Sequence, residues 1–411
     1  MNETLIRLKL SFFLGLRSLQ RGSIGSLVMT VVIIGMVFTN MIFLPSVITG
    51  AINLFVDQTI EFQSGDILIE PRENAELIED LEDLLARVNR VPGVLRAAPH
   101  NNIGGVMKFE GNRLAGSVIA IRPRDEVLVT GVSKMIREGQ YLGEGDTGVV
   151  VIGNYVAGHK DKSEDLMPSL GGVRTGDSID IEFTNGVVRT YRVKGIAETK
   201  SYLADQAVFI TWDELESIRG QEIDQATEVL IRTVPGEDEE EVKLSLIGMG
   251  IQEDIKTWPD LLGKAFAQIV QSYGVINSIS TIVSIVIAVV VIFIVIMIKT
   301  LNNRRQIGIL KAIGIHRTTI TFSYVFQVII LAIMGIIFGL FILFALDRYF
   351  AVYPIVFPDG DIRPAFTIAD IVTNAVLLFI ASAVAGLIPA WLIAREAVSY
   401  THLTLPTILL V

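Results

Sequence analysis

The chain has 411 residues, 51% of them hydrophobic, and a mean hydropathy of +0.54. This composition excludes an ordinary soluble protein with a polar surface and indicates a membrane protein. The net charge of -10 excludes a nucleic-acid-binding protein, and the absence of cysteine excludes disulfides and thiol chemistry.

Four stretches without Asp, Glu, Lys or Arg are long enough to cross a bilayer, which takes about 20 apolar residues. They cover residues 22–56, 265–298, 318–346 and 371–394. The apolar core of the first stretch is longer than that of a signal peptide, and no small-residue cleavage site follows it. We therefore expect a retained membrane anchor.

Charge sets the expected orientation, because basic residues gather on the cytoplasmic side of a membrane. Basic residues precede the first stretch and lie between the second and third, and Arg395 follows the fourth. Residues 51–270 carry 38 acidic and 22 basic side chains, whereas the rest of the chain has a net charge of +6. We therefore expect a multi-pass protein of the inner (cytoplasmic) membrane with both termini in the cytoplasm.

The predicted fold is an α-helical membrane protein with four transmembrane helices and a mixed α+β extracytoplasmic domain inserted between helices 1 and 2. The expected order is a cytoplasmic amphipathic segment 1–22, helix 1 at 23–50, the outer domain 51–270, helix 2 at 271–298, a cytoplasmic helix and loop 299–318, helix 3 at 319–345, an outer loop 346–369, helix 4 at 370–394 and a C-terminal tail 395–411.

Within the outer domain, alternating apolar residues predict strands at 65–71, 116–121, 148–153, 178–183, 187–193 and 206–210. Leucines at helical spacing predict a helix over 74–90, which Pro92 and Gly93 end. A hairpin with a three-residue loop, 184–186, would pair Phe183 with Val187 and leave Gly186 in a left-handed bulge, keeping apolar side chains on one face.

No catalytic constellation is present in the sequence. It contains neither a GxxxxGK[ST] phosphate loop nor an HExxH or GxSxG motif. His159 and the carboxylates at 161, 164 and 165 are interpreted as solvated charge rather than a metal site. We expect a non-catalytic chain without a cofactor of its own.

The four apolar stretches lack the carboxylates that ion-coupled transporters use, so polar residues there are interpreted as interhelix hydrogen-bonding groups. Gly335 and Gly339 form a small-xxx-small face, and Ala381 and Ala385 repeat the pattern in the last stretch. We predict that these four residues are helix-packing positions.

The segment 304–314, RRQIGILKAIG, predicts a short amphipathic helix at the cytoplasmic surface, with Ile307, Leu310, Ile313 and Gly314 along one edge. A basic loop that only fixes the topology would explain its charges equally well. It would not explain the glycines.

This segment resembles the signature that follows the second span in FtsX-like permeases of ABC transporters, of the MacB and lipoprotein-release type. Ile307, Gly308, Leu310, Lys311, Ala312 and Gly314 match that signature, whereas Gln306 replaces its common Glu. Residues 91–94, VPGV, and the stretch from 149 to 199 resemble a MacB-type periplasmic core domain. The order of one span, an outer domain and three spans matches over nearly the whole chain.

The resemblance implies a permease subunit that docks on a separate ABC ATP-binding subunit, where ATP and Mg would be bound. The implied ATPase-coupling residues are Arg304, Arg305, Gln306, Ile307, Gly308, Leu310, Lys311, Ala312 and Gly314, with Leu310 expected to contact the partner. Other implied partners are a second permease subunit, identical or a paralogue, and a periplasmic adaptor or outer-membrane channel.

The implied function is mechanotransmission: ATP-driven motion of the outer domain drives export or extraction of a lipoprotein, lipid, peptide or amphiphile. The alternative is an FtsX-like transducer that regulates an extracytoplasmic cell-wall hydrolase, although an outer domain of this size favours transport. Residues 399–411 are apolar, unlike the tail expected for the family, and we expect them to derive from an assembly or cloning junction.

Overall fold

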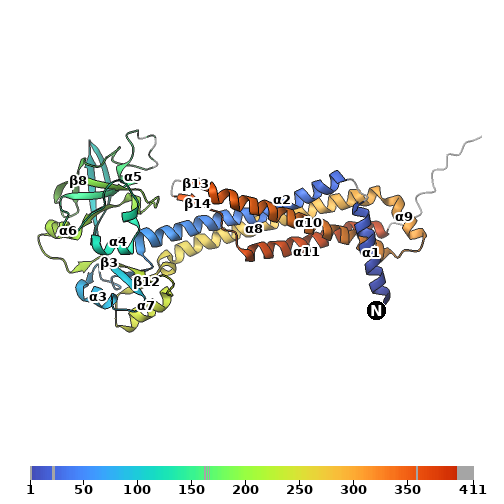
Figure 1. The fold of residues 1–411 in the computed structure, drawn as a ribbon, viewed down its shortest axis with the longest axis horizontal. Helices are drawn as coiled ribbons and strands as arrows, with labels where there is room; N and C mark the ends of the chain where they lie inside the picture. The colour runs from blue at the N-terminus through green and yellow to red at the C-terminus, as the bar shows by residue number, and fades with distance from the viewer. Residues whose placement is uncertain are drawn as a thin grey trace, which may run out of the picture. The chain divides into compact units, whose positions relative to one another are not determined.

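The computed structural model describes residues 2–20, 24–161, 163, 165, 167–357 and 360–395, and it divides into two compact units (Figure 1). The helical unit comprises Met1–Ala51, Val270–Ile355 and Ile362–Val411. The sheet unit comprises Ile52–Ile269 and Val356–Asp361. The junction expected at 399 lies outside the described residues.

The helical unit is built mainly from long apolar helices. Its elements are α1 (Asn2–Gln20), α2 (Ile24–Thr59), α8 (Trp258–Asn302), α9 (Arg304–Ala312), α10 (Arg317–Val352) and α11 (Ile368–Arg395). The strands β13 (Ile355–Phe357) and β14 (Gly360–Ile362), between α10 and α11, belong mostly to the sheet unit. The last turns of α2 and the first turns of α8 belong to the sheet unit.

Four helices in the described part of the chain are long and apolar enough to cross a membrane. These candidate spans are Ile24–Ser64, Gln271–Asn302, Arg317–Val352 and Ile368–Trp391. The helices that carry them extend beyond the predicted spans, most clearly α8, which begins at Trp258. The length comes from polar turns that continue the helical hydrogen bonding past the apolar stretch.

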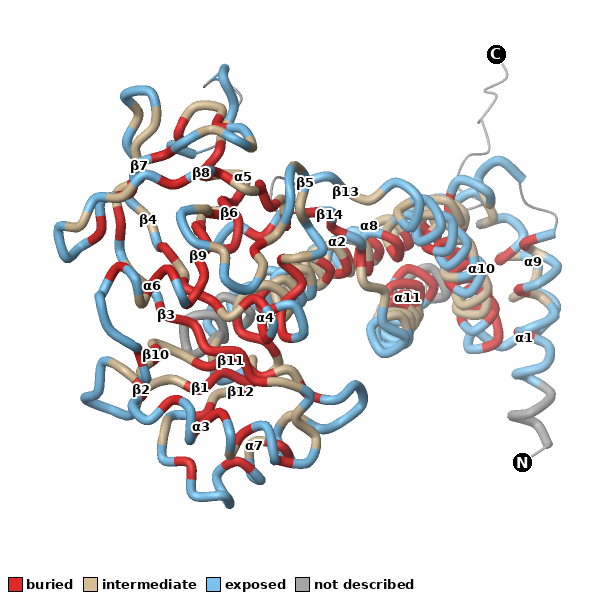
Figure 2. The backbone as a smooth tube through the Cα atoms, turned by 60° about the vertical axis from the view of Figure 1, so that its left-hand side comes forward, coloured by how far each residue is buried: buried red, intermediate tan, exposed pale blue. Residues whose placement is uncertain are grey.

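Inside the helical unit, buried side chains follow one stripe of each helix (Figure 2). Phe38 of α2, Ile292 of α8, Val328 of α10 and Leu378 of α11 belong to one apolar cluster. The helix α1 packs on α10, where Ser11 donates a hydrogen bond to the carbonyl oxygen of Thr319 at 3.0 Å. Close packing along these stripes and interhelix hydrogen bonds such as this one hold the unit together.

The sheet unit contains ten strands joined in one sheet, counted over the described residues. They are β1 (Ile67–Glu70), β3 (Val94–Phe109), β4 (Asn112–Ile121), β5 (Ile136–Gly139), β6 (Val149–Gly153), β7 (Ser178–Phe183), β8 (Val188–Ala197), β9 (Val208–Thr211), β11 (Glu228–Thr233) and β12 (Asp254–Thr257). A separate pair is formed by β2 (Ile78–Glu79) and β10 (Gln225–Ala226).

Six of the strands close on themselves. β3 pairs with β4, β4 with β9, β9 with β6, β6 with β8, β8 with β7, and β7 returns to β3. The long strand β3 makes this possible, because its second half pairs with β7 while its first half pairs with β11. The result is a small barrel extended by the edge β11, β1 and β12.

Short helices cover the sheet and complete its core. They are α3 (Leu81–Val88), α4 (Pro123–Val129), α5 (Asn154–Ala157), α6 (Trp212–Arg219) and α7 (Glu239–Gly248), with single turns η1 (Ile60–Ser64), η2 (Val132–Lys134) and η3 (Ala204–Gln206). Leu81, Leu84, Leu85 and Val88 of α3 enter the main cluster with the inward residues of the strands. Figure 2 shows this core in red.

The hairpin prediction is confirmed: Ile179 pairs with Tyr191, the amide of Phe183 donates to the carbonyl of Val187 at 2.9 Å, and Gly186 has a φ of 81°. The helix predicted over 74–90 is wrong in its first half. Ile78 and Glu79 form β2, Asp80 takes a left-handed conformation, and α3 begins only at Leu81. Pairing with β10 removes residues before 81 from the helix.

Candidate functional site

The helix α9 is ended by a defined set of local hydrogen bonds. At its C-terminus Gly314 has a φ of 88°, its amide donates to the carbonyl of Lys311 at 3.1 Å, and the amide of Ile315 donates to the carbonyl of Leu310 at 3.0 Å. This pattern is a Schellman motif, which favours glycine because of the left-handed conformation. His316 then caps α10 by accepting from the amide of Thr318 at 3.3 Å.

One face of α9 is held by the helical unit. Ile307 is buried in the apolar cluster of that unit, and Leu310 and Ile315 pack against it. Leu310, which the sequence predicted as a partner contact, therefore supports its own chain. The sequence placed Ile307, Leu310 and Ile313 on one edge of the helix, but Ile313 is exposed and does not share the buried side of the other two.

The opposite face of α9 is exposed and partly apolar. Arg305, Gln306, Ile309, Ala312 and Ile313 are exposed, at the spacing of one helix face. Ile309 retains 55% and Ile313 69% of its accessible surface. The sequence interpretation missed Ile309, although its i,i+4 spacing to Ile313 was a signal for a shared face.

Gly308 is the second notable feature of α9. A Cβ atom placed there would meet nothing within 4 Å, so no packing contact of this chain requires a glycine. Glycine inside a helix costs about 0.5–1 kcal/mol relative to alanine. Close approach of another molecule to α9 would explain why a glycine stands here.

The other predicted coupling residues lie at the start and on the flank of α9. Arg304 is the first residue of α9, and its side chain is outside the described part of the structure. Lys311 is half-buried on the flank of the helix. α1 and α9 lie at the same end of the helical unit (Figure 1), so Lys9 and Arg17 of α1 add positive charge there.

The predicted packing residues lie between helices. A Cβ on Gly335 would fall 2.7 Å from Cβ of Ile34, and one on Gly339 would fall 2.8 Å from the carbonyl oxygen of Gly35. These contacts place α10 directly against α2. On α11, Ala385 is buried in the apolar cluster and Ala381 is half-buried.

Two family models match the sequence. The MacB-like periplasmic core domain matches residues 26–247, and the FtsX-like permease C-terminal domain matches residues 278–398. The chain belongs to the FtsX-like permeases with a MacB-like periplasmic core domain. Among curated proteins no match was found.

Solved structures with some likeness to this permease include the periplasmic region of MacB from Actinobacillus actinomycetemcomitans (11% identity, TM-score 0.36, covering 50% of this chain and 95% of that one). The extracellular domain of the noncanonic ABC-type transporter YknZ from Gram-positive bacteria has 12% identity and a TM-score of 0.33, with coverage of 46% and 97%. A domain of a permease protein from Porphyromonas gingivalis has 17% identity and a TM-score of 0.31, with coverage of 44% and 81%.

Family membership identifies this chain as an ABC-type permease, a multi-pass membrane protein that works with an ATP-binding partner. The sequence itself has no phosphate loop, as noted above. The exposed face of α9 is therefore the part of this permease to consider for contact with the partner.

Proposed function

We propose that this permease docks through α9 on a separate ATP-binding subunit and couples ATP hydrolysis there to movement of the sheet unit outside the membrane. That movement drives export or extraction of a lipoprotein, lipid, peptide or amphiphile. The observation that carries the proposal is the exposed pair Ile309 and Ile313 on a basic helix that has an interior glycine.

The composition of the spans supports motion rather than passage of a polar substrate between them. All four candidate spans are strongly apolar. The polar contacts described there are hydrogen bonds of a side chain with its own helix or with a neighbouring helix. Ser284 of α8, for example, lies 3.4 Å from Asn40 of α2. Such bonds hold helices together and supply no obvious path for an ion.

The proposal includes the orientation expected from charge, with both termini and α9 in the cytoplasm. ATP and Mg would be bound by the partner subunit. A second permease chain, identical or a paralogue, would form a dimer with this one. Where an outer membrane exists, a periplasmic adaptor or outer-membrane channel would receive the substrate. The alternative, regulation of a cell-wall hydrolase, would use the same motion without transport.

Substitution of the exposed pair tests the docking. We expect Ile309→Asp and Ile313→Asp each to weaken co-purification of the ATP-binding subunit from detergent at least about tenfold, because burial of one isoleucine contributes about 1.5–3 kcal/mol. Leu310→Asp is a poorer test, since it would also disturb packing inside the helical unit.

Ile247→Asp is the matched control, because Ile247 on α7 is exposed to 49% and lies in the sheet unit. We expect this variant to keep the partner. Co-purification at wild-type level by both α9 variants would show that α9 is not the docking helix. Weakening by the control as well would assign the loss to the added charge rather than to the site.

A further inference from the structure

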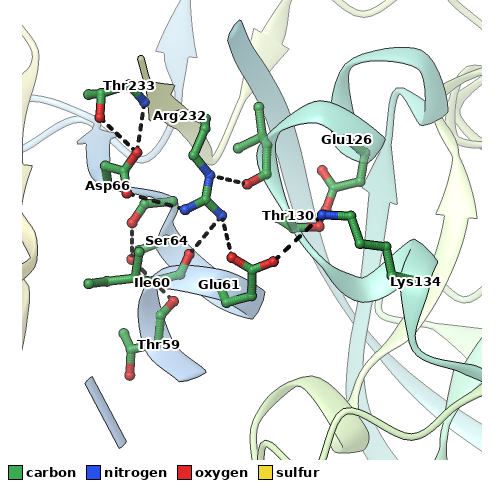
Figure 3. A network of polar contacts seen from close by, with 12 residues as sticks. Thr59, Ile60, Glu61, Ser64, Asp66, Glu126, Thr130, Lys134, Arg232 and Thr233 are labelled. Atoms are coloured by element: carbon green, nitrogen blue, oxygen red, sulfur yellow. Dashed lines mark hydrogen bonds and ion pairs between the residues drawn. The ribbon is translucent and has the colours of Figure 1, made fainter. Parts of the chain in front are cut away.

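The end of α2 joins the sheet unit through an unusual turn (Figure 3). After Thr59 the helix widens into the π-turn η1, in which the hydroxyl of Ser64 donates to the carbonyl of Thr59 at 3.3 Å. Gly65 follows with a φ of 66°, and a Cβ there would fall 2.5 Å from the carbonyl oxygen of Ile231. Only glycine lets the turn approach β11 this closely.

Arg232 of β11 connects this turn to two other elements, as Figure 3 shows. Its Nη2 donates to Glu61 at 3.1 Å and to the carbonyl of Ile60 at 3.5 Å, both in η1. Its Nη1 donates to Asp66 at 3.2 Å, and its Nε donates to the carbonyl of Val129, in the last turn of α4, at 2.8 Å. The side chain is 18% exposed, so these bonds are largely shielded from water.

Further contacts hold the partners of Arg232 in place. Asp66 accepts from the amide and the hydroxyl of Thr233 at 2.7 and 2.9 Å. The carbonyl of Glu61 accepts from the amide of Gly131 at 2.8 Å, and its carboxylate lies 4.0 Å from Lys134. Asp66 is thus held by Arg232 and by two groups of Thr233, and the charge-assisted bonds of Arg232 to Asp66 and Glu61 are stronger than neutral ones.

The start of α8 lies at the same edge of the sheet. β12, which leads directly into α8, pairs with β1 so that Thr257 faces Ile67. Leu261 in the first turn of α8 packs against a cluster that includes Leu68, Val129 and Leu230. Both span-bearing helices are therefore attached to the edge β12, β1 and β11, and Val129 contacts both attachments.

We propose that Arg232 is a positioning residue for mechanotransmission, which fixes the end of α2 to this sheet edge and to α4 so that movement of the first span reaches the sheet unit. Without it, η1 is held to the sheet unit mainly by two backbone bonds, from Asp66 to Ile231 and from Gly131 to Glu61, on either side of a glycine that has more backbone freedom than other residues. This inference rests on the proposed function, since it assigns the joint through which the ATP-driven motion passes.

The test is hydrogen–deuterium exchange of the full permease purified with its ATP-binding subunit, with and without a slowly hydrolysed ATP analogue. In the wild-type complex we expect the analogue to change exchange both in α2 and in β1, β11 and β12. In Arg232→Gln we expect the response of α2 to persist and that of the three strands to be reduced, because the attachment through β12 and α8 remains. Amides 60–66 should also exchange roughly tenfold faster in every state, because charge-assisted bonds are removed.

Arg96→Gln is the matched control. Arg96 faces Arg232 in the pairing of β3 with β11, and it forms an ion pair with Asp125 of α4. Because its ion-pair partner in the described chain is on α4 and not on η1, we expect its complex to keep the nucleotide response of the strands. If Arg232→Gln does not fold, Glu61→Gln removes the charge from the bond between Arg232 and η1 while leaving the contact with the Ile60 carbonyl, and it should reduce the same response.

Each outcome separates the joint from the proposed function. An unchanged response of β1, β11 and β12 in both Arg232→Gln and Glu61→Gln would overturn the role of Arg232 and leave the proposed function standing. Equal loss in Arg96→Gln would overturn it too, by showing a general effect of removing arginines. A wild-type complex whose sheet unit does not respond to the analogue would overturn mechanotransmission itself.

Discussion

At the residue scale, the buried pair of His100 and Glu126 lies in the sheet unit. Nε2 of His100 lies 2.7 Å from Glu126, and Nδ1 lies 3.6 Å from Glu228. Burial by itself would lower the pKa of His100, but the Glu126 and Glu228 carboxylates outweigh it and raise the pKa to about 10. The imidazole is therefore charged at neutral pH, a property that scattered histidines in a sequence do not reveal.

This pair predicts a pH-dependent stability. The folded pKa of about 10 exceeds the unfolded value of about 6.5, so the contribution is complete below pH 6.5 and is lost as the pH rises toward 10. We expect the free energy of unfolding to fall by up to about 1.4 kcal/mol per pH unit in that window. Denaturant unfolding of the full chain in detergent, followed by tryptophan fluorescence, measures it.

The control must remove both members of the pair. His100→Gln alone would leave Glu126 buried without its partner, and burial would then raise the pKa of the carboxyl and add a pH dependence of its own. The double variant His100→Gln with Glu126→Gln has no such group, and we expect a shallower dependence between pH 6.5 and 10. The same slope in the wild type and the double variant would contradict this account.

At the element scale, the sequence pattern predicted correctly the elements that have strong local signals. It failed for elements whose conformation depends on the strand with which they pair. The hairpin of β7 and β8 was predicted in register, because Asn185-Gly186 places the turn and the apolar alternation on both sides shows which residues share a face. The strand β3 was not predicted, since its residues 99–105 include proline, asparagines and glycines. These are tolerated because they lie where β3 changes its partner from β11 to β7, so that the pairing on that side is interrupted.

The same distinction applies to the candidate site. The position of α9 followed from its charges and glycines, which are local. The sequence did not show which face of α9 is exposed, because the residues that pack around Ile307 and Leu310 are far away in the sequence. Arg232 was invisible for a similar reason: its partners at 61, 66 and 129 meet only in the folded sheet unit.

Contact between α2 and α10 gives a prediction about helix packing. We expect Gly339→Ala to destabilise the chain by about 1–3 kcal/mol, because its Cβ would fall 2.8 Å from the backbone oxygen of Gly35, which cannot move aside freely. Resistance of the purified chain to denaturation in detergent measures the loss.

The matched control is Gly274→Ala in α8, where a Cβ would meet nothing within 4 Å. There the substitution should stabilise the helix by up to about 1 kcal/mol through higher helix propensity. The same change from glycine to alanine is thus expected to lower the stability at position 339 and to raise it at position 274. A neutral result at Gly339 would mean that α2 and α10 do not pack as closely as the structure shows.

At the scale of the whole molecule, four candidate spans place both ends of the helical unit on one side of the membrane if all four cross it. Charge then decides which side. The segment 51–270 carries 38 acidic and 22 basic side chains, whereas basic residues gather in α1, in α9 and at the start of α10. From the positive-inside rule we therefore expect α9 to face the cytoplasm.

Single cysteines test this orientation in a chain that has none of its own. We expect Ser163→Cys, exposed in the sheet unit, to react with a membrane-impermeant maleimide in intact cells, or in spheroplasts where an outer membrane blocks access. Asn302→Cys, exposed at the end of α8, should react only after permeabilisation, which also controls for its accessibility. Labelling of Asn302→Cys in intact cells would place α9 outside, where no cytoplasmic ATP-binding subunit could meet it, and the proposed coupling would fail with the topology.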